Sequence, residues 1–115
     1  MARRASRRPR ARHAADVFAA LGDPTRLALV DKLADGTRRS IAQLSEDEPV
    51  TRQAITKHLR VLEDARLVRS ERAGRENLYV LDPARIAEAR SYIDEVARRW
   101  DEALGRLQAF VQLHP

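Results

Sequence analysis

The sequence predicts a mainly α-helical domain with one small β-hairpin before its last helix. Three observations support this fold class: two Asp-Pro pairs of the kind that start helices, an amphipathic stretch over residues 50–68, and two β-prone runs on either side of Gly74. At 115 residues the chain is long enough for one domain with a modest core. Burial of further apolar surface against a second copy of the chain is therefore a realistic expectation.

Composition narrows the class of protein. The chain has no run of about 18 apolar residues, and its Arg-rich start is not followed by an apolar signal segment, so we expect a cytoplasmic protein without membrane attachment. The absence of cysteine excludes disulfides and thiolate metal sites. Residues 1–12 contain six arginines and no acid, so the remainder of a chain with net charge +5 carries −1. The distribution of charge, rather than its total, must identify any surface for nucleic acid.

Clear end signals bound the first two helices. Residues 13–22 predict a short helix that ends at Gly22. Asp23 is then the expected N-cap of a second helix, with Pro24 at its first position and its end near Gly36. We expect this second helix to bury an apolar face made of Leu27, Val30 and Leu33.

A pair of closely spaced helices follows. Ser40 and Gln43 have the spacing of a capping box and predict a helix of barely two turns that ends before Pro49. Thr51 can cap the next helix, so the connection between the two is tight. In that next helix a continuous apolar stripe, formed by Ile55, Leu59 and Leu62, is expected to face the core. The opposite face is polar and carries Arg52, Gln53, Thr56, Lys57 and Arg60.

The last third of the chain combines a hairpin with a long helix. The β-prone runs LVRSE and NLYVL flank Gly74, which can take the positive φ that a hairpin turn requires. Asp82 and Pro83 then predict the start of a helix from about residue 84 to about residue 113. The apolar residues of this helix recur at a spacing of about 3.5, which predicts a seam for another helix.

In order, these elements form a winged helix-turn-helix arrangement of five helices plus a wing. The stretches ALGDPTRLALVDKLADG, SIAQLSE and VTRQAITKHLRVLEDARLVRSERAGRENLYVLD, within about residues 14–82, resemble the ArsR/SmtB family of bacterial transcriptional repressors. The last helix fits by position and pattern rather than by motif. The resemblance implies a homodimer, formed through the terminal helices, that binds a partly palindromic double-stranded DNA operator and blocks transcription.

In this arrangement the polar face of the helix after Thr51 is expected to enter the major groove, which is about 12 Å wide and admits an α-helix. Arg52 and Gln53 lie in the first turn, and we expect them to read guanine and adenine edges. Residues one turn later are placed for a base edge or a phosphate. The expected contacts of the recognition helix are Thr51, Arg52, Gln53, Thr56, Lys57, His58 and Arg60.

The roles of four candidate residues are less specific. His58 lies between the polar face and the core stripe, so it could donate to a phosphate or hydrogen-bond a neighbouring helix, and the sequence favours neither. Arg72 and Arg75 flank the hairpin turn and are expected to contact backbone phosphate or the minor groove, which positions the protein without specifying a sequence. Tyr79, on the returning strand, is expected to be a packing residue with a polar tip.

The sequence departs from the metal-sensing members of the family it resembles. Their recurrent thiolate site has two cysteines one residue apart in the short helix, at the places of Ser40 and Ala42. A second family site uses Asp, His and Glu on the last helix, but residues 84–113 contain no histidine. We therefore expect a metal-independent regulator with no metal site and no cofactor, and a small-molecule inducer is left open.

Large apolar residues on the terminal helices are expected to form the subunit interface, because large side chains bury the most area per residue. The expected interface residues are Phe18, Ile93, Val96, Trp100, Leu104, Leu107 and Phe110. The domain is expected to cover residues 13–113. A disordered Arg-rich arm over residues 1–12 is expected to add phosphate contacts or solubility, and its composition also fits a transit peptide.

Two other classes of function are weighed against a DNA-binding regulator. An enzyme is not expected, since the sequence shows no nucleophile–base pair and no phosphate-binding loop. The serious alternative is a protein-interaction module with a winged-helix fold that does not bind DNA. Binding to a DNA fragment from upstream of the protein's own gene separates these two possibilities.

Overall fold

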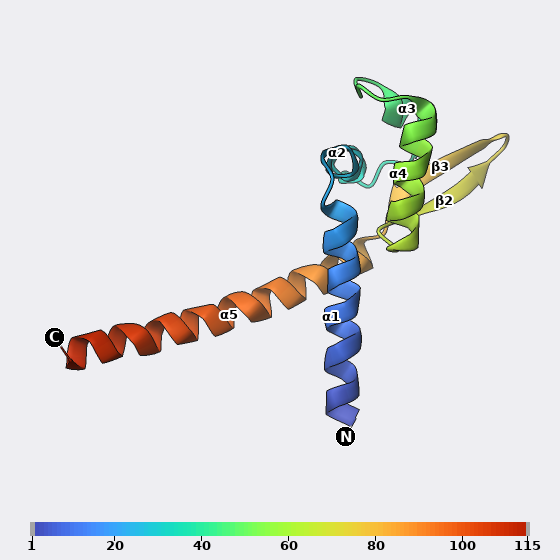
Figure 1. Cartoon of the computed structure of the whole chain (residues 1–115). Coiled ribbons are helices and arrows are strands. Elements are labelled where there is room, and N and C mark those ends of the chain that lie inside the picture. The colour runs from blue at the N-terminus through green and yellow to red at the C-terminus, as the bar shows by residue number, and fades with distance from the viewer. Residues whose placement is uncertain (1, 115) are drawn as a thin grey trace.

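The structure is a computed structural model that describes residues 2–114, with the backbone alone for residues 2–11. Five helices and a hairpin follow one another in the predicted order (Figure 1). The elements are α1 (Ala2–Leu21), α2 (Pro24–Leu33), β1 (Arg39–Ser40), α3 (Ile41–Ser45), α4 (Arg52–Asp64), β2 (Val68–Ala73), β3 (Glu76–Leu81) and α5 (Pro83–Leu113). The predicted fold class, a mainly α-helical winged helix-turn-helix, is confirmed.

The helix starts lie where the caps predict them. The Asp23 carboxylate accepts a hydrogen bond from the backbone N–H of Arg26 at 3.1 Å, and this bond is the main reason that the pKa of Asp23 lies below its ordinary value. Asp82 likewise accepts from the N–H of Ala84 at 3.1 Å at the start of α5. Because capping is a local interaction, it could be predicted from residue type and spacing alone.

The sheet has three antiparallel strands in the order β1-β3-β2. Ala73 pairs with Glu76 across a two-residue loop, and Gly74 in that loop has φ +63°, as the sequence predicts. The strand β1 was not predicted. It is only two residues long and is formed by pairing Arg39 with Tyr79, so it has no periodicity of its own to read.

The core lies between α4, α2, α3, the sheet and the ends of α1 and α5 that meet the domain. The apolar stripe of α4 is fully buried, as predicted. In α2 the predicted face is partly wrong, because Leu27 is half exposed while Leu29 and Leu33 are fully buried. The cause is the docking of α2 on α4, α1 and β3, which selects the Leu29 side of the helix. Tyr79 is almost fully buried, and this burial raises the pKa of its hydroxyl.

Helix α1 is longer than the sequence predicts. A disordered arm is predicted over residues 1–12, whereas the described backbone is helical from Ala2 and Met1 lies outside the described residues. Alanine and arginine, which dominate this segment, both have high helix propensity. Nothing in the structure tests the expected phosphate contacts of this segment, which stay a prediction.

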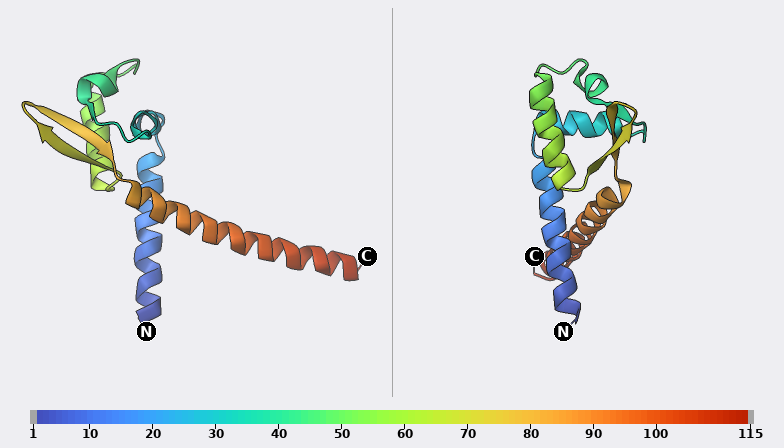
Figure 2. Two further views of the ribbon diagram at one scale, coloured as in Figure 1. Left: turned by 180° about the vertical axis from the view of Figure 1, so that it is seen from behind. Right: turned by 90° about the vertical axis from the view of Figure 1, so that its right-hand side faces the viewer.

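Helix α5 leaves the domain and extends well beyond it (Figure 1 and Figure 2). It crosses α1 near its own start, and in Figure 1 and the left view of Figure 2 its C-terminal half has no other helix or strand beside it. The radius of gyration is 19.1 Å, compared with about 13 Å for a compact domain of about this length. Within residues 2–114, no helix is long and apolar enough to cross a bilayer.

The end of α4 contains a strained residue that no pattern in the sequence predicts. Arg66 has φ +61°, in the left-handed region that favours glycine. The N–H of Leu67 donates to the carbonyl of Leu62 at 3.0 Å, and the N–H of Arg66 donates to the carbonyl of Glu63 at 2.9 Å. This pair of bonds is a Schellman motif, in which the position of Arg66 is usually glycine.

We expect Arg66→Gly to raise the free energy of unfolding by about 0.5–1 kcal/mol, because glycine adopts this conformation without a Cβ clash. Thermal unfolding followed by circular dichroism measures the effect. Arg66→Ala is the control, since it removes the charged side chain but keeps the Cβ atom. A glycine variant no more stable than the alanine variant contradicts the assignment of strain.

Candidate nucleic-acid interface

The turn between α3 and α4 is held in place from α2. The Nζ atom of Lys32 donates to the carbonyls of Leu44 and Glu46 and lies 3.0 Å from a carboxylate oxygen of Glu48. Asp47, in the middle of this turn, has φ +64°. The single cation of Lys32 thus binds three groups of the turn that sets the angle between α3 and α4. Sequence reasoning missed Lys32, because its partners lie far from it in the chain.

Helix α4 presents one buried face and one polar face. Thr51 caps the helix by accepting from the N–H of Ala54 at 3.1 Å, which fixes the position of the first turn. The side chains of Arg52, Gln53 and Lys57 are exposed and make no hydrogen bond or ion pair with other described residues. Arg60 continues this exposed face one turn later. The first turns of α4 therefore carry donors and acceptors that are available to a ligand.

Besides Thr51, two further predicted contact residues are engaged within the domain. The Thr56 hydroxyl donates to the carbonyl of Arg52 at 2.9 Å, so its proton is used and only its acceptor capacity is available. His58 is largely buried, with 22% of its side chain exposed, and its Nδ1 atom lies 3.3 Å from Nη1 of Arg26 on α2. Of the two roles that the sequence leaves open for His58, this contact favours the hydrogen bond to a neighbouring helix.

The hairpin has an exposed basic tip, and further from the tip its arginine charges are partly compensated by Glu71. Glu71 lies 2.9 Å from Arg38 and 3.8 Å from Arg69, so these charges partly compensate one another. Arg72 and Arg75 are both exposed beside the turn, and Nε of Arg72 donates to the carbonyl of Gly74 at 3.4 Å. The two arginines that the sequence identifies are thus the ones near the end of the hairpin.

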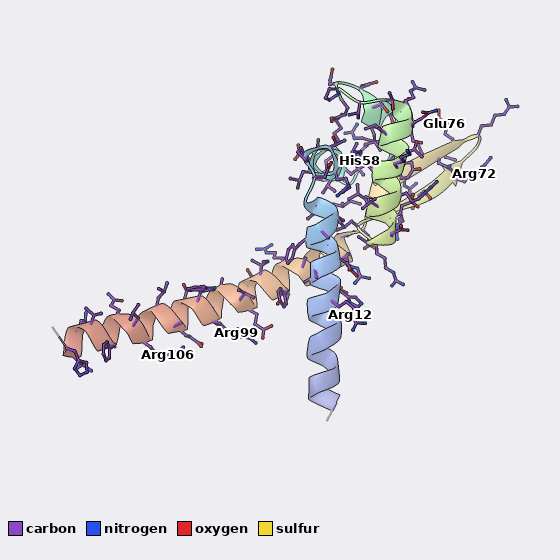
Figure 3. All side chains as sticks on the ribbon, viewed as in Figure 1. Arg12, His58, Arg72, Glu76, Arg99 and Arg106 are labelled. Atoms are coloured by element: carbon purple, nitrogen blue, oxygen red, sulfur yellow. The ribbon has the colours of Figure 1, made fainter. Side chains whose placement is uncertain are left out.

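The two polar surfaces lie at one end of the molecule. In Figure 1 and the left view of Figure 2 the N-terminal end of α4 and the hairpin turn both lie at the end of the molecule away from the C-terminal half of α5. Figure 3 shows Arg72 on the hairpin and His58 on the side of α4 that faces α2. A single duplex can therefore approach α4 and the wing together without meeting the long helix.

Comparison with known proteins also identifies a helix-turn-helix regulator. Residues 21–71 match a family model described as a helix-turn-helix domain. The HTH-type transcriptional regulator Rv2034 of Mycobacterium tuberculosis is 44% identical over 85 residues, which cover 74% of this chain and 76% of that protein. The HTH-type transcriptional repressor SmtB of the same species is 32% identical over 91 residues, which cover 79% of this chain and 65% of that protein.

A solved structure of an ArsR-like transcriptional regulator from Rhodococcus sp. RHA1 superimposes with a TM-score of 0.74 at 34% identity, over 85% of this chain and 92% of that one. The chain belongs to the ArsR/SmtB family of helix-turn-helix regulators. The resemblance predicted from the sequence is confirmed. This ArsR/SmtB-family protein is a DNA-binding transcriptional regulator, and the family is not enzymatic.

In this ArsR/SmtB-family chain Ser40, at the place of one of the family's thiolate ligands, has a structural role. The Ser40 hydroxyl accepts from the N–H of Gln43 at 3.2 Å, and the Gln43 side chain accepts from the N–H of Ser40 at 2.8 Å. Ser40 is therefore the N-cap of α3. Among the described residues, no three His, Asp or Glu side chains gather in a way that could hold a metal ion.

Proposed function

We propose that this protein is a homodimeric repressor that reads a partly palindromic operator with α4 and binds the DNA backbone with its wing. The observation that carries the proposal is the set of exposed, unengaged polar side chains on the first turns of a helix whose opposite face is fully buried. A surface side chain that has no partner within the protein gives up no internal contact when it binds a base edge.

The proposed division of labour follows from residue type. Arg52 and Gln53 have bidentate side chains suited to guanine and adenine in the major groove, and Lys57 is suited to a base edge or a phosphate. Arg72 and Arg75, at the end of the wing, supply charge to phosphates. First-turn contacts are also favoured because no acidic residue lies there and the helix N-terminus carries partial positive charge. Thr51, Thr56 and Arg60 are proposed as supporting contacts, whereas His58 is proposed to hold α4 against α2 rather than to contact DNA.

The proposed dimer rests on the C-terminal half of α5. Its apolar side chains are strongly exposed in one subunit: Trp100 by 64%, Leu107 by 59% and Phe110 by 59%. A helical segment of about 15 residues without tertiary contacts is only marginally stable in water. A contiguous exposed apolar strip on such a segment indicates an interface. A second copy presents the same strip with the same spacing, which a two-fold interface requires. The proposed interface consists of Phe18, Ile93, Val96, Trp100, Leu104, Leu107 and Phe110.

We also propose that the regulator works without a metal ion, since Ser40 is a helix cap and no cysteine is present. An inducer, if one exists, then acts through other chemistry.

The function is tested by selecting fragments of the source genome on the purified protein and measuring their affinity by gel shift. We expect enriched fragments with Kd of about 10⁻⁸ M or lower at physiological salt, and half-sites about 10 base pairs apart or a multiple of that. A promoter that carries such a site should become more active when the protein is deleted. If no fragment is bound better than a scrambled duplex, the protein-interaction module becomes the better assignment.

Gln53→Ala tests base reading by α4. We expect a loss of about 1–3 kcal/mol on the selected operator and almost no change on scrambled DNA, because only the operator offers the matching adenine edge. Gln112→Ala, an exposed glutamine on α5, is the matched control. An unchanged ratio of operator to scrambled affinity shows that Gln53 does not read bases.

Arg75→Ala tests backbone binding by the wing. It should weaken operator and scrambled DNA alike and reduce the slope of log K against log salt by about one per lost contact, or about two per dimer. Titration at several salt concentrations measures the slope, and Arg90→Ala on α5 is the control for lost charge. Loss of specificity with an unchanged slope assigns base reading to the wing instead.

Trp100→Glu tests the subunit interface. Sedimentation at micromolar concentration should show the wild-type protein near twice 13.1 kDa and the variant as a monomer, because the substitution places a charge in an apolar contact. Arg98→Glu, on the opposite side of α5, should remain a dimer. A monomeric wild-type protein under these conditions contradicts the proposed assembly.

A further inference from the structure

Arg26 lies where three helices meet. Its backbone is in the first turn of α2, its Nε atom donates to the carbonyl of Ala20, and its Nη2 atom donates to the carbonyl of Ala19 at 3.4 Å. Both carbonyls belong to the last turn of α1, where few backbone N–H groups are available, although the carbonyl of Ala19 also accepts from the N–H of Gly22 at 3.2 Å. The guanidinium therefore caps α1 with a charge of the favourable sign.

The same guanidinium also reaches the recognition helix. Nη1 of Arg26 lies 3.3 Å from Nδ1 of His58, in the middle of α4, and Asp23 lies 3.8 Å from the same nitrogen. The planar fork of arginine thus joins the end of α1 to the side of α4 that faces away from DNA in the proposed complex. Direct packing between α1 and α4 is slight compared with that between α1 and α5. A polar link is consequently an important constraint on the angle between α1 and α4.

The angle between α1 and α4 affects how a dimeric protein binds two half-sites of DNA. This step rests on the proposed function, in which α1 and α5 form the subunit interface and α4 enters the DNA. In such a dimer the distance and rotation between the two reading helices are set by how each α4 is held against its own α1. Half-sites must match that geometry, because a shift of two base pairs turns one half-site by about 70° and moves it by about 7 Å.

We propose that Arg26 is a positioning residue that fixes α4 relative to the interface helix α1 through His58, and thereby sets the half-site spacing that the dimer accepts. Arg26 touches no DNA in this arrangement. Its contribution is to discrimination between operators of different spacing rather than to the reading of any one base pair.

The link is tested first inside one subunit, where neither DNA nor dimerisation is needed. The chain has no cysteine, so Ala15→Cys on α1 and Lys57→Cys on α4 accept spin labels specifically. Pulsed EPR, with labelled protein diluted into unlabelled protein, gives the distribution of distances between the two helices. We expect a narrow distribution for the otherwise wild-type chain and a broader one for Arg26→Ala.

Arg39→Ala is the matched control. Arg39 also donates from Nε to a carbonyl at a helix end, that of Lys32 in α2, and it pairs with Asp35 at 3.2 Å, but it contacts neither α1 nor α4 in this way. Arg39→Ala therefore removes a guanidinium–carbonyl hydrogen bond at a different helix end, so the distribution of distances between α1 and α4 should stay narrow. If Arg26→Ala does not fold, Arg26→Lys and His58→Phe replace it, since each weakens the link while leaving the remaining contacts in place.

The second measurement uses the selected operator with zero, one or two base pairs inserted between its half-sites. We expect the wild-type and Arg39→Ala proteins to lose about tenfold or more in affinity at two inserted base pairs, and the Arg26 variants to lose less than about threefold. Equal loss in all variants, or an unchanged distance distribution in a folded Arg26 or His58 variant, overturns the proposal. A wild-type protein that ignores spacing or binds no DNA contradicts the proposed function instead, and the EPR result then still decides whether Arg26 links the helices.

Discussion

Burial of one face of α4 is the constraint on which the site depends. Ile55, Leu59 and Leu62 are all fully buried, and complete burial of each is worth about 1.5–3 kcal/mol. A rotation of α4 by one residue position would expose part of this stripe and bury Arg52 or Lys57. The cost would approach the total stability of a typical domain, which is about 5–15 kcal/mol. The core therefore determines which side chains α4 presents, even though none of the presented side chains belongs to the core.

The parts of the fold that could be predicted are those with local causes. Caps at Asp23, Thr51 and Asp82 act within four residues, and Gly74 is required by its own backbone conformation, so residue type and spacing are sufficient. The exposed polar face of α4 could be predicted for the same reason, since it is the complement of a periodic apolar stripe. These features place the recognition helix and the wing before any tertiary contact is known.

The features that sequence reasoning missed depend on contacts between distant segments. Which leucine of α2 is buried depends on how α2 docks on α4, and β1 exists only because β3 lies beside it. Lys32 holds the turn before α4 through groups more than ten residues away. The role of His58 stayed open because the sequence does not show that Arg26 faces it. Arg66 gives no signal at all, since an arginine in the left-handed region breaks the preference that makes helix ends recognisable.

The polar links and the apolar core have different consequences for recognition. Apolar packing fixes the rotation of α4 about its own axis, because the stripe is continuous along the helix. It fixes the tilt of α4 relative to α1 much less well, since contacts between α4 and α1 are few. Hydrogen bonds with defined donors and acceptors are directional, so a guanidinium that binds two carbonyls of α1 and a ring nitrogen of α4 restrains the tilt that apolar packing leaves free. In the proposed dimer, rotation of α4 selects the side chains that meet the bases, whereas tilt selects the spacing between the two sites that are read. Base recognition and spacing recognition would then rest on separate interactions, and substitutions could change one without the other.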